Sequence, residues 1–169
     1  MGVQQSDELT VFVSQTGGCG MKRSGAVSNQ RLRLEQIETD LEILQLAMQS
    51  LQSAGLKNFH VDLSHARILP ALLKDHAVNA ELSASIKEAL SHKNVSGMRE
   101  LSRHLPQALG NALQALVQMY GDISILKQAR AEFAAWPQVL TALDELEWLA
   151  SHAEHPVSID LADLRGYAY

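Results

Sequence analysis

The sequence is poor in the features that mark secreted, membrane-spanning or metal-rich proteins. Its 169 residues contain a single cysteine, Cys19, so no internal disulfide can form and a reducing compartment is expected. No apolar run approaches the roughly 20 residues needed to cross a bilayer. The N-terminus has no charged start followed by a long apolar stretch, as a secretory signal would. We therefore expect a cytoplasmic protein with no membrane association.

Basic residues are also scarce. Lysine and arginine number 14 against 19 aspartates and glutamates, which gives a formal net charge of -5. Phosphate binding requires clustered Lys and Arg, so a dominant nucleic-acid surface is not expected. The apolar fraction of 46% is that of a globular protein. The length suits one domain, or a helical lobe with part of a sheet.

Motifs for cofactors and metals are missing as well. The glycine-rich stretch 17–20 matches neither the dinucleotide fingerprint nor the P-loop, and a bare turn is the simpler interpretation. Cys19 has no second cysteine beside it, and the seven histidines show no i, i+4 pair of the kind that binds zinc on one helix. Asp144, Glu145 and Glu147 read as a solvated helix face rather than a catalytic carboxylate pair. We expect no cofactor and no metal.

The first half of the sequence predicts two strands and a helix between them. Residues 9–13 are rich in β-branched and aromatic side chains, which favours a strand. The segment 39–42 reads as a capping box, so a helix is expected to begin at Thr39 and to end near Gly55. Residues 59–63 alternate apolar and polar side chains, which predicts a half-buried strand.

Most of the remaining sequence predicts short helices. A helix around 66–73 follows, with Ser64 as its cap, and from 78 to 153 apolar residues recur at helical spacing. An alternating strand is expected to begin at Val157. Further helix starts are expected at four residues that cap or open helices: Ser96, Pro106, Asp122 and Pro137. The order of elements predicts a mostly helical α+β protein, in which a sheet domain carries a helical lobe.

Four segments resemble a known family at family-like spacing. They are Ile37 to Ile43, Asp62 to Leu69, Leu116 to Gly121, and Arg165 to Tyr169. Together they resemble the regulatory subunits of short-form ATP phosphoribosyltransferase, which are paralogues of histidyl-tRNA synthetases. The resemblance implies part of a class II aminoacyl-tRNA synthetase-like sheet domain with a helical insertion lobe. It divides the sequence into four parts: a poorly matched N-terminal segment (1–36), part of the synthetase-like core (37–75), the helical insertion lobe (76–155) and a truncated pocket strand (156–169).

The resemblance also implies a histidine-pocket-like site. In the family's pattern Arg165 reaches a carboxylate or phosphate, a task suited to the guanidinium fork. Gly166, Tyr167 and Tyr169 belong to the same strand, and His65 lies where a strand meets a helix. Each has a simpler alternative: a structural ion pair for Arg165, core packing for the tyrosines, and a capping or packing role for His65.

The resemblance implies a function without catalysis by this chain. A regulatory subunit binds the short catalytic subunit in a hetero-oligomer, raises its activity and contributes to feedback inhibition by histidine. Ala168 stands where synthetases have an aspartate, which favours the regulatory paralogue, and we expect the sequence to cover the middle of such a subunit. A fragment of a histidyl-tRNA synthetase and a ligand-free helical interaction module are the alternatives. Because two strands alone would leave unpaired edges, a homodimer is also expected.

Overall fold

The structure is a computed structural model that describes residues 9–14, 26–56 and 58–164, with side chains from residue 37 onward. Its described strands form one sheet in the order β1-β2-β4-β3. β1 (Leu9–Ser14), β2 (Phe59–Ser64) and β4 (Ser158–Asp160) run parallel, and β3 (Tyr120–Gly121) is antiparallel to β4. A mostly helical α+β fold is thus confirmed. The short strand β3 was not predicted, because the leucine-tyrosine-glycine step that contains it was assigned to the helical insertion.

β2 is one of the two interior strands, and the prediction that it is half-buried was wrong. It pairs with β1 over its whole length, from Leu9 with Phe59 to Ser14 with Ser64, and with β4 on its other side. Val61 and Leu63 are buried as expected, but Asp62 and Ser64 on the opposite face are each only 7% exposed. Parallel strands are usually covered on both faces, so the polar residues of β2 are interior groups that need partners.

α1 (Ala26–Ser53) begins thirteen residues before the predicted start at Thr39. No proline or glycine interrupts 26–38, so the capping-box residues lie within a continuous helix instead of at its end. The predicted end is confirmed. Gly55 has a φ of +91°, its N–H donates to Gln52 O at 2.9 Å, and the N–H of Leu56 donates to Leu51 O at 3.1 Å. This is a Schellman ending that favours glycine.

Two predicted helix caps were wrong by a few residues. α2 (Ile68–Leu73) starts after Arg67 and has no side-chain cap, so Ser64 ends β2 instead. α4 (Val95–Ser102) is capped by Asn94, whose Oδ1 accepts from Gly97 N at 2.8 Å, and Ser96 lies inside the first turn. Asparagine and serine are about equally good caps, so two adjacent candidates could not be ranked from sequence.

The other helices follow the predicted pattern. α3 (Ala80–Ser91), α5 (Gln107–Leu116), α6 (Ile125–Glu132) and α7 (Pro137–His152) complete the described helices. Pro106 precedes α5 and Pro137 opens α7, as predicted. A third predicted cap was also wrong: the N-cap of α6 is Ser124, and Asp122 lies two residues earlier, where its Oδ1 accepts a hydrogen bond from Ser124 N at 2.8 Å.

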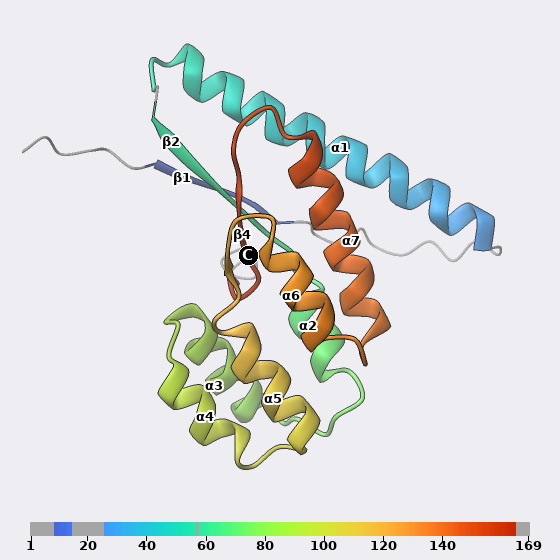
Figure 1. Ribbon diagram of the computed structural model, residues 1–169, viewed down its shortest axis with the longest axis vertical. Helices are drawn as coiled ribbons and strands as arrows, with labels where there is room; N and C mark the ends of the chain where they lie inside the picture. The colour runs from blue at the N-terminus through green and yellow to red at the C-terminus, as the bar shows by residue number, and fades with distance from the viewer. Residues whose placement is uncertain (1–8, 15–25, 57, 165–169) are drawn as a thin grey trace, which may run out of the picture.

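The helices pack into one core with the sheet. α1 packs on α7, and α7 contacts α2, α6 and β2. α3, α4 and α5 form a group at the end of the molecule farthest from α1 (Figure 1). Among the side chains that the structure describes, Phe133 is the largest that is fully buried, and it belongs to a core rich in leucines, with isoleucines and methionines. None of the helices described is long and apolar enough to cross a membrane.

Candidate functional site

The candidate site lies where the parallel strands β2 and β4 end. Asp62 pairs with Ser158 and Leu63 with Ile159, so the residues that follow the two strands leave the sheet side by side. His65 follows β2, and 161–164 follow β4. The other predicted pocket residues, Arg165, Gly166, Tyr167 and Tyr169, come directly afterwards and lie outside the described residues.

Within the described residues, the predicted pocket strand is shorter than the sequence suggested. β4 ends at Asp160. The N–H of Ala162 donates to Asp160 Oδ1 at 3.1 Å, and the N–H of Asp163 donates to Asp160 O at 3.3 Å. An aspartate that binds backbone groups two and three residues ahead forms a turn. The prediction that the alternating strand continues through Leu161 was therefore wrong.

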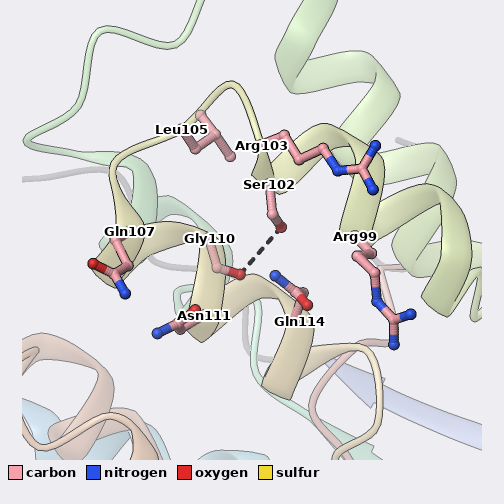
Figure 2. Close-up of a pocket in the computed structure, with 8 residues that line it drawn as sticks. All are labelled: Arg99, Ser102, Arg103, Leu105, Gln107, Gly110, Asn111 and Gln114. Carbon is pink, nitrogen blue, oxygen red and sulfur yellow. Dashed lines mark hydrogen bonds between the residues drawn. The ribbon is translucent and has the colours of Figure 1, made fainter.

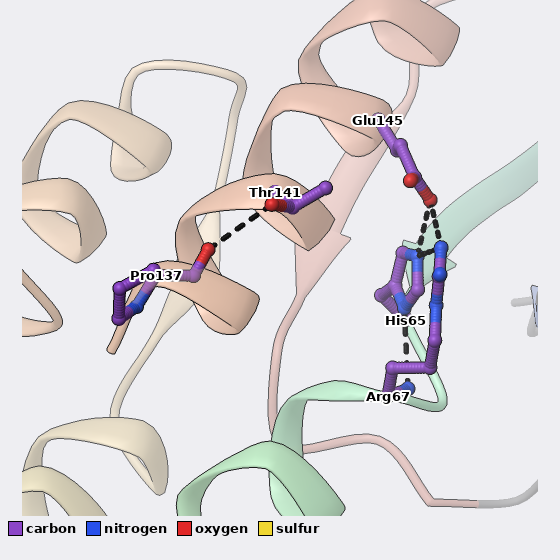
Figure 3. Close-up of polar contacts among 5 residues, drawn as sticks. All are labelled: His65, Arg67, Pro137, Thr141 and Glu145. Atoms are coloured by element: carbon purple, nitrogen blue, oxygen red, sulfur yellow. Dashed lines mark hydrogen bonds and ion pairs between the residues drawn. The ribbon is translucent and has the colours of Figure 1, made fainter. Parts of the chain in front are cut away.

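His65 is a buried residue held on both ring nitrogens (Figure 3). Its side chain is 0% exposed. Nδ1 accepts from the N–H of Arg67 at 3.2 Å, and Nε2 lies 2.9 Å from Glu145 Oε2. A carboxylate can only accept, so Nε2 carries the proton and His65 is held as a single tautomer. These contacts fit the capping or packing role considered for His65, and its role in ligand binding stays a prediction.

Glu145 was predicted wrongly as part of a solvated acidic face. Its side chain is 12% exposed, and its Oε2 accepts hydrogen bonds from both His65 and Arg67. Burial raises the pKa of Glu145, but the hydrogen bond from His65 and the charge of Arg67 outweigh it, so that this pKa lies below its ordinary value. The neighbouring carboxylates do face solvent: Asp144 and Glu147 are more than half exposed and pair with Arg130.

A sequence signal for Glu145 did exist. It is three residues after Ala142 and four before Leu149, and both of these are buried on α7. Residues at that spacing share one helix face. A glutamate on the buried face of an amphipathic helix requires a cationic or hydrogen-bonding partner, and the cluster of His65, Arg67 and Glu145 supplies it.

A second polar cluster joins β4 to the turn between α3 and α4. Lys93 pairs with Oδ1 of Asp160, which is 4% exposed. Nζ of Lys93 also lies 5.7 Å from the ring centroid of Tyr120 on β3. Lys93 adopts a positive φ of 51°, an uncommon conformation for a residue other than glycine. These contacts fix the turn against the end of β4.

A third cluster contains a serine, a histidine and an aspartate, but not in a catalytic arrangement. Ser158 Oγ lies 2.7 Å from His60 Nε2 and also donates to Asp62 Oδ1. Asp62 Oδ1 lies 3.2 Å from the same Nε2. In a serine hydrolase the aspartate binds one ring nitrogen and the nucleophile the other. Both groups here face one nitrogen, so the cluster serves to satisfy the buried Asp62.

The described residues contain no group of three or more His, Cys, Asp or Glu side chains that could hold a metal ion. The groups present around the strand ends are hydrogen-bonding donors, two carboxylates paired with cations, and the partly exposed guanidinium of Arg67.

Comparisons with known proteins identify relatives of this chain. A family model described as histidyl-tRNA synthetase matches residues 33–169. ATP phosphoribosyltransferase regulatory subunits of Paraburkholderia xenovorans and Burkholderia cenocepacia are 46% and 47% identical over 134 residues, which is 79% of this chain. The chain spans 35% of the length of these relatives.

A solved structure gives the same result. An ATP phosphoribosyltransferase regulatory subunit/histidyl-tRNA synthetase from Bacillus halodurans is 27% identical, with a TM-score of 0.63 over 76% of this chain and 35% of that one. The class II synthetase-like fold expected from the sequence is thereby confirmed. The chain belongs to the histidyl-tRNA synthetase family, and ATP phosphoribosyltransferase regulatory subunits are among its relatives.

Proposed function

We propose that this chain acts as part of a non-catalytic regulatory subunit of ATP phosphoribosyltransferase in histidine biosynthesis. The observation that carries the proposal is its identity of 46–47% to curated regulatory subunits over 134 residues. The proposed partner is the short catalytic subunit, bound in a cytoplasmic hetero-oligomer. Phosphoribosyl transfer would take place on that partner, which is consistent with a candidate site whose described groups are already hydrogen-bonded to one another.

We further propose that histidine binds beyond the end of β4. In this proposal Arg165 holds the ligand's carboxylate with its guanidinium fork, Tyr167 and Tyr169 line the pocket, and Gly166 leaves room for the backbone to approach. His65 contributes from the neighbouring strand end as a wall that is held in place by Glu145. Feedback would then be a coupling free energy between histidine binding and the partner's activity.

The test is a mixing experiment with the short catalytic subunit. Phosphoribosyl-ATP formation is followed with and without histidine, and the mass of the complex is measured by size-exclusion chromatography with light scattering. We expect a complex, a higher rate and inhibition by histidine. Arg165→Ala should abolish the response to histidine while leaving the complex intact. Arg130→Ala, which removes an arginine of α6 that pairs with the exposed carboxylates Asp144 and Glu147, is the matched control. The absence of both a complex and a rate effect would refute the proposal.

Aminoacylation is the second candidate, because the matching family model and the Bacillus halodurans protein both carry the name histidyl-tRNA synthetase. Its test is histidine-dependent exchange of pyrophosphate into ATP. Exchange above background would replace the regulatory proposal with an enzymatic one. If the chain binds neither histidine nor the catalytic subunit, the remaining alternative is a helical interaction module without a ligand.

A further inference from the structure

An open groove crosses the helical group formed by α3, α4 and α5, away from the candidate histidine site. It has a volume of about 280 Å³ and runs between α4 and α5. Small-molecule sites usually occupy roughly 300–1,000 Å³ and bury most of their ligand. This groove is smaller, and its polar walls are exposed to solvent, so its shape favours a segment of another polypeptide.

The two walls of the groove carry complementary sets of hydrogen-bonding groups (Figure 2). One wall presents Arg99 of α4 and Arg103 just after it, four residues apart. The other presents the side-chain amides of α5 at helical spacing. The lining contains no carboxylate, and its eight residues are Arg99, Ser102, Arg103, Leu105, Gln107, Gly110, Asn111 and Gln114.

The guanidinium groups are available for a ligand. Arg103 Nη1 pairs with Glu100 Oε2 at 2.5 Å, but both side chains are more than 60% exposed. Such a surface pair contributes little and can be exchanged for another partner. Arg99 makes no ion pair with any residue in the part of the chain that the structure describes. Two arginines without a fixed acidic partner favour a carboxylate ligand.

The floor of the groove is fixed by a close approach of the two helices. Ser102 Oγ lies 2.7 Å from Met98 O in its own helix and 3.1 Å from Gly110 O in α5. A Cβ at Gly110 would lie 3.0 Å from Ser102 O, so glycine allows the helices to come this near. The amide and guanidinium walls are therefore held at a constant separation before any ligand arrives, which lowers the entropy cost of binding.

We propose that this groove binds an acidic polypeptide segment of a partner protein, with Arg99 as its principal carboxylate contact. Gln107, Asn111 and Gln114 can each donate to and accept from the peptide groups of such a segment. The chain as a whole is acidic, so a local basic groove selects an acidic partner without attracting polyanions to the rest of the surface. The proposal is independent of the regulatory role, because its test needs neither histidine nor the catalytic subunit.

The test uses fluorescence anisotropy with labelled hexaglutamate as the probe and hexaglutamine as the uncharged comparison. We expect saturable binding of hexaglutamate that weakens as salt is added. Arg99→Gln should weaken it about tenfold, as expected for loss of a charged hydrogen bond. Lys127→Gln, the same change of charge on α6, should have no effect, and circular dichroism checks that both variants are folded.

Three results would overturn the proposal. Hexaglutamate could bind no more tightly than hexaglutamine, or the two variants could lose affinity equally, which would indicate only general charge attraction. Inorganic phosphate could displace the peptide at equal concentration, and the groove would then be a site for small anions. Arg99→Lys keeps the positive charge but removes the guanidinium group. We expect this variant to bind hexaglutamate more tightly than Arg99→Gln but less tightly than the wild-type protein, because lysine cannot form the bidentate contact.

Discussion

Replacing Glu145 with alanine should destabilise this protein far more than replacing its neighbour Asp144. The side chain of Glu145 is only 12% exposed, and its Oε2 accepts a hydrogen bond from the fully buried His65 at 2.9 Å. A hydrogen bond to a charged group contributes about 1.5–3 kcal/mol. The pair with Arg67 adds at most about 0.5 kcal/mol, because the arginine is 41% exposed. We therefore expect Glu145→Ala to lower the free energy of unfolding by about 2–3 kcal/mol.

The assay is urea unfolding followed by circular dichroism at neutral pH. Glu145→Gln keeps an oxygen that can accept from His65, so its loss should be about 1 kcal/mol. Asp144→Ala is the matched control on the same helix: its side chain is 65% exposed, and the expected loss is below about 0.5 kcal/mol. Equal stability of the Glu145→Ala and Asp144→Ala variants would refute the buried cluster.

The same cluster predicts a pH dependence with a definite sign. The folded state lowers the pKa of Glu145 from its ordinary value of 4.5. A group with a depressed pKa stabilises the fold above its unfolded pKa, and this stability is lost as the pH falls through the folded pKa. The stability difference between the wild-type protein and Glu145→Gln should therefore be constant above pH 4.5 and shrink in more acidic solution. A difference that grows on acidification would contradict the assignment.

Three further substitutions, and Ser96→Ala as a control for one of them, test the local geometry by urea unfolding. Gly55→Ala should cost about 1 kcal/mol, because alanine is strained at a φ of +91°. Gly110→Ala should cost about 1–3 kcal/mol, because its Cβ would lie 3.0 Å from the backbone oxygen of Ser102; no loss would mean that α4 and α5 can separate freely. Asn94→Ala should cost about 1 kcal/mol through loss of the cap on Gly97 N, whereas Ser96→Ala should cost much less.

Local signals in the sequence identified most elements but not all of their ends. The proline starts of α5 and α7 and the glycine end of α1 were predictable, because these residues restrict the backbone directly. The start of α1 was not, because Thr39 and Glu42 satisfy a capping box whether or not a helix already precedes them. A cap motif predicts a helix start only where the preceding residues cannot themselves be helical.

Burial in the sheet depended on pairings that a local pattern does not contain. Residues 59–63 alternate as a half-buried strand would, yet β2 became an interior strand once β1 and β4 paired with its two edges. Asp62 is tolerated there because Ser158 and His60 bind it. The two-residue strand β3 exists only through its antiparallel contact with β4, and no period can be detected in two residues.

The two ion-paired clusters show how the helical segment reaches the candidate site. Glu145 of α7 contacts His65 after β2, and Lys93 of the α3–α4 turn contacts Asp160 at the end of β4. Each contact joins a residue of the predicted insertion lobe to the end of one parallel strand. Any movement of those strand ends upon ligand binding must change at least one buried, charged hydrogen bond to the helices. Under the proposed function, these two contacts would connect the histidine site to the helices, and Glu145→Gln tests that connection in the mixing experiment.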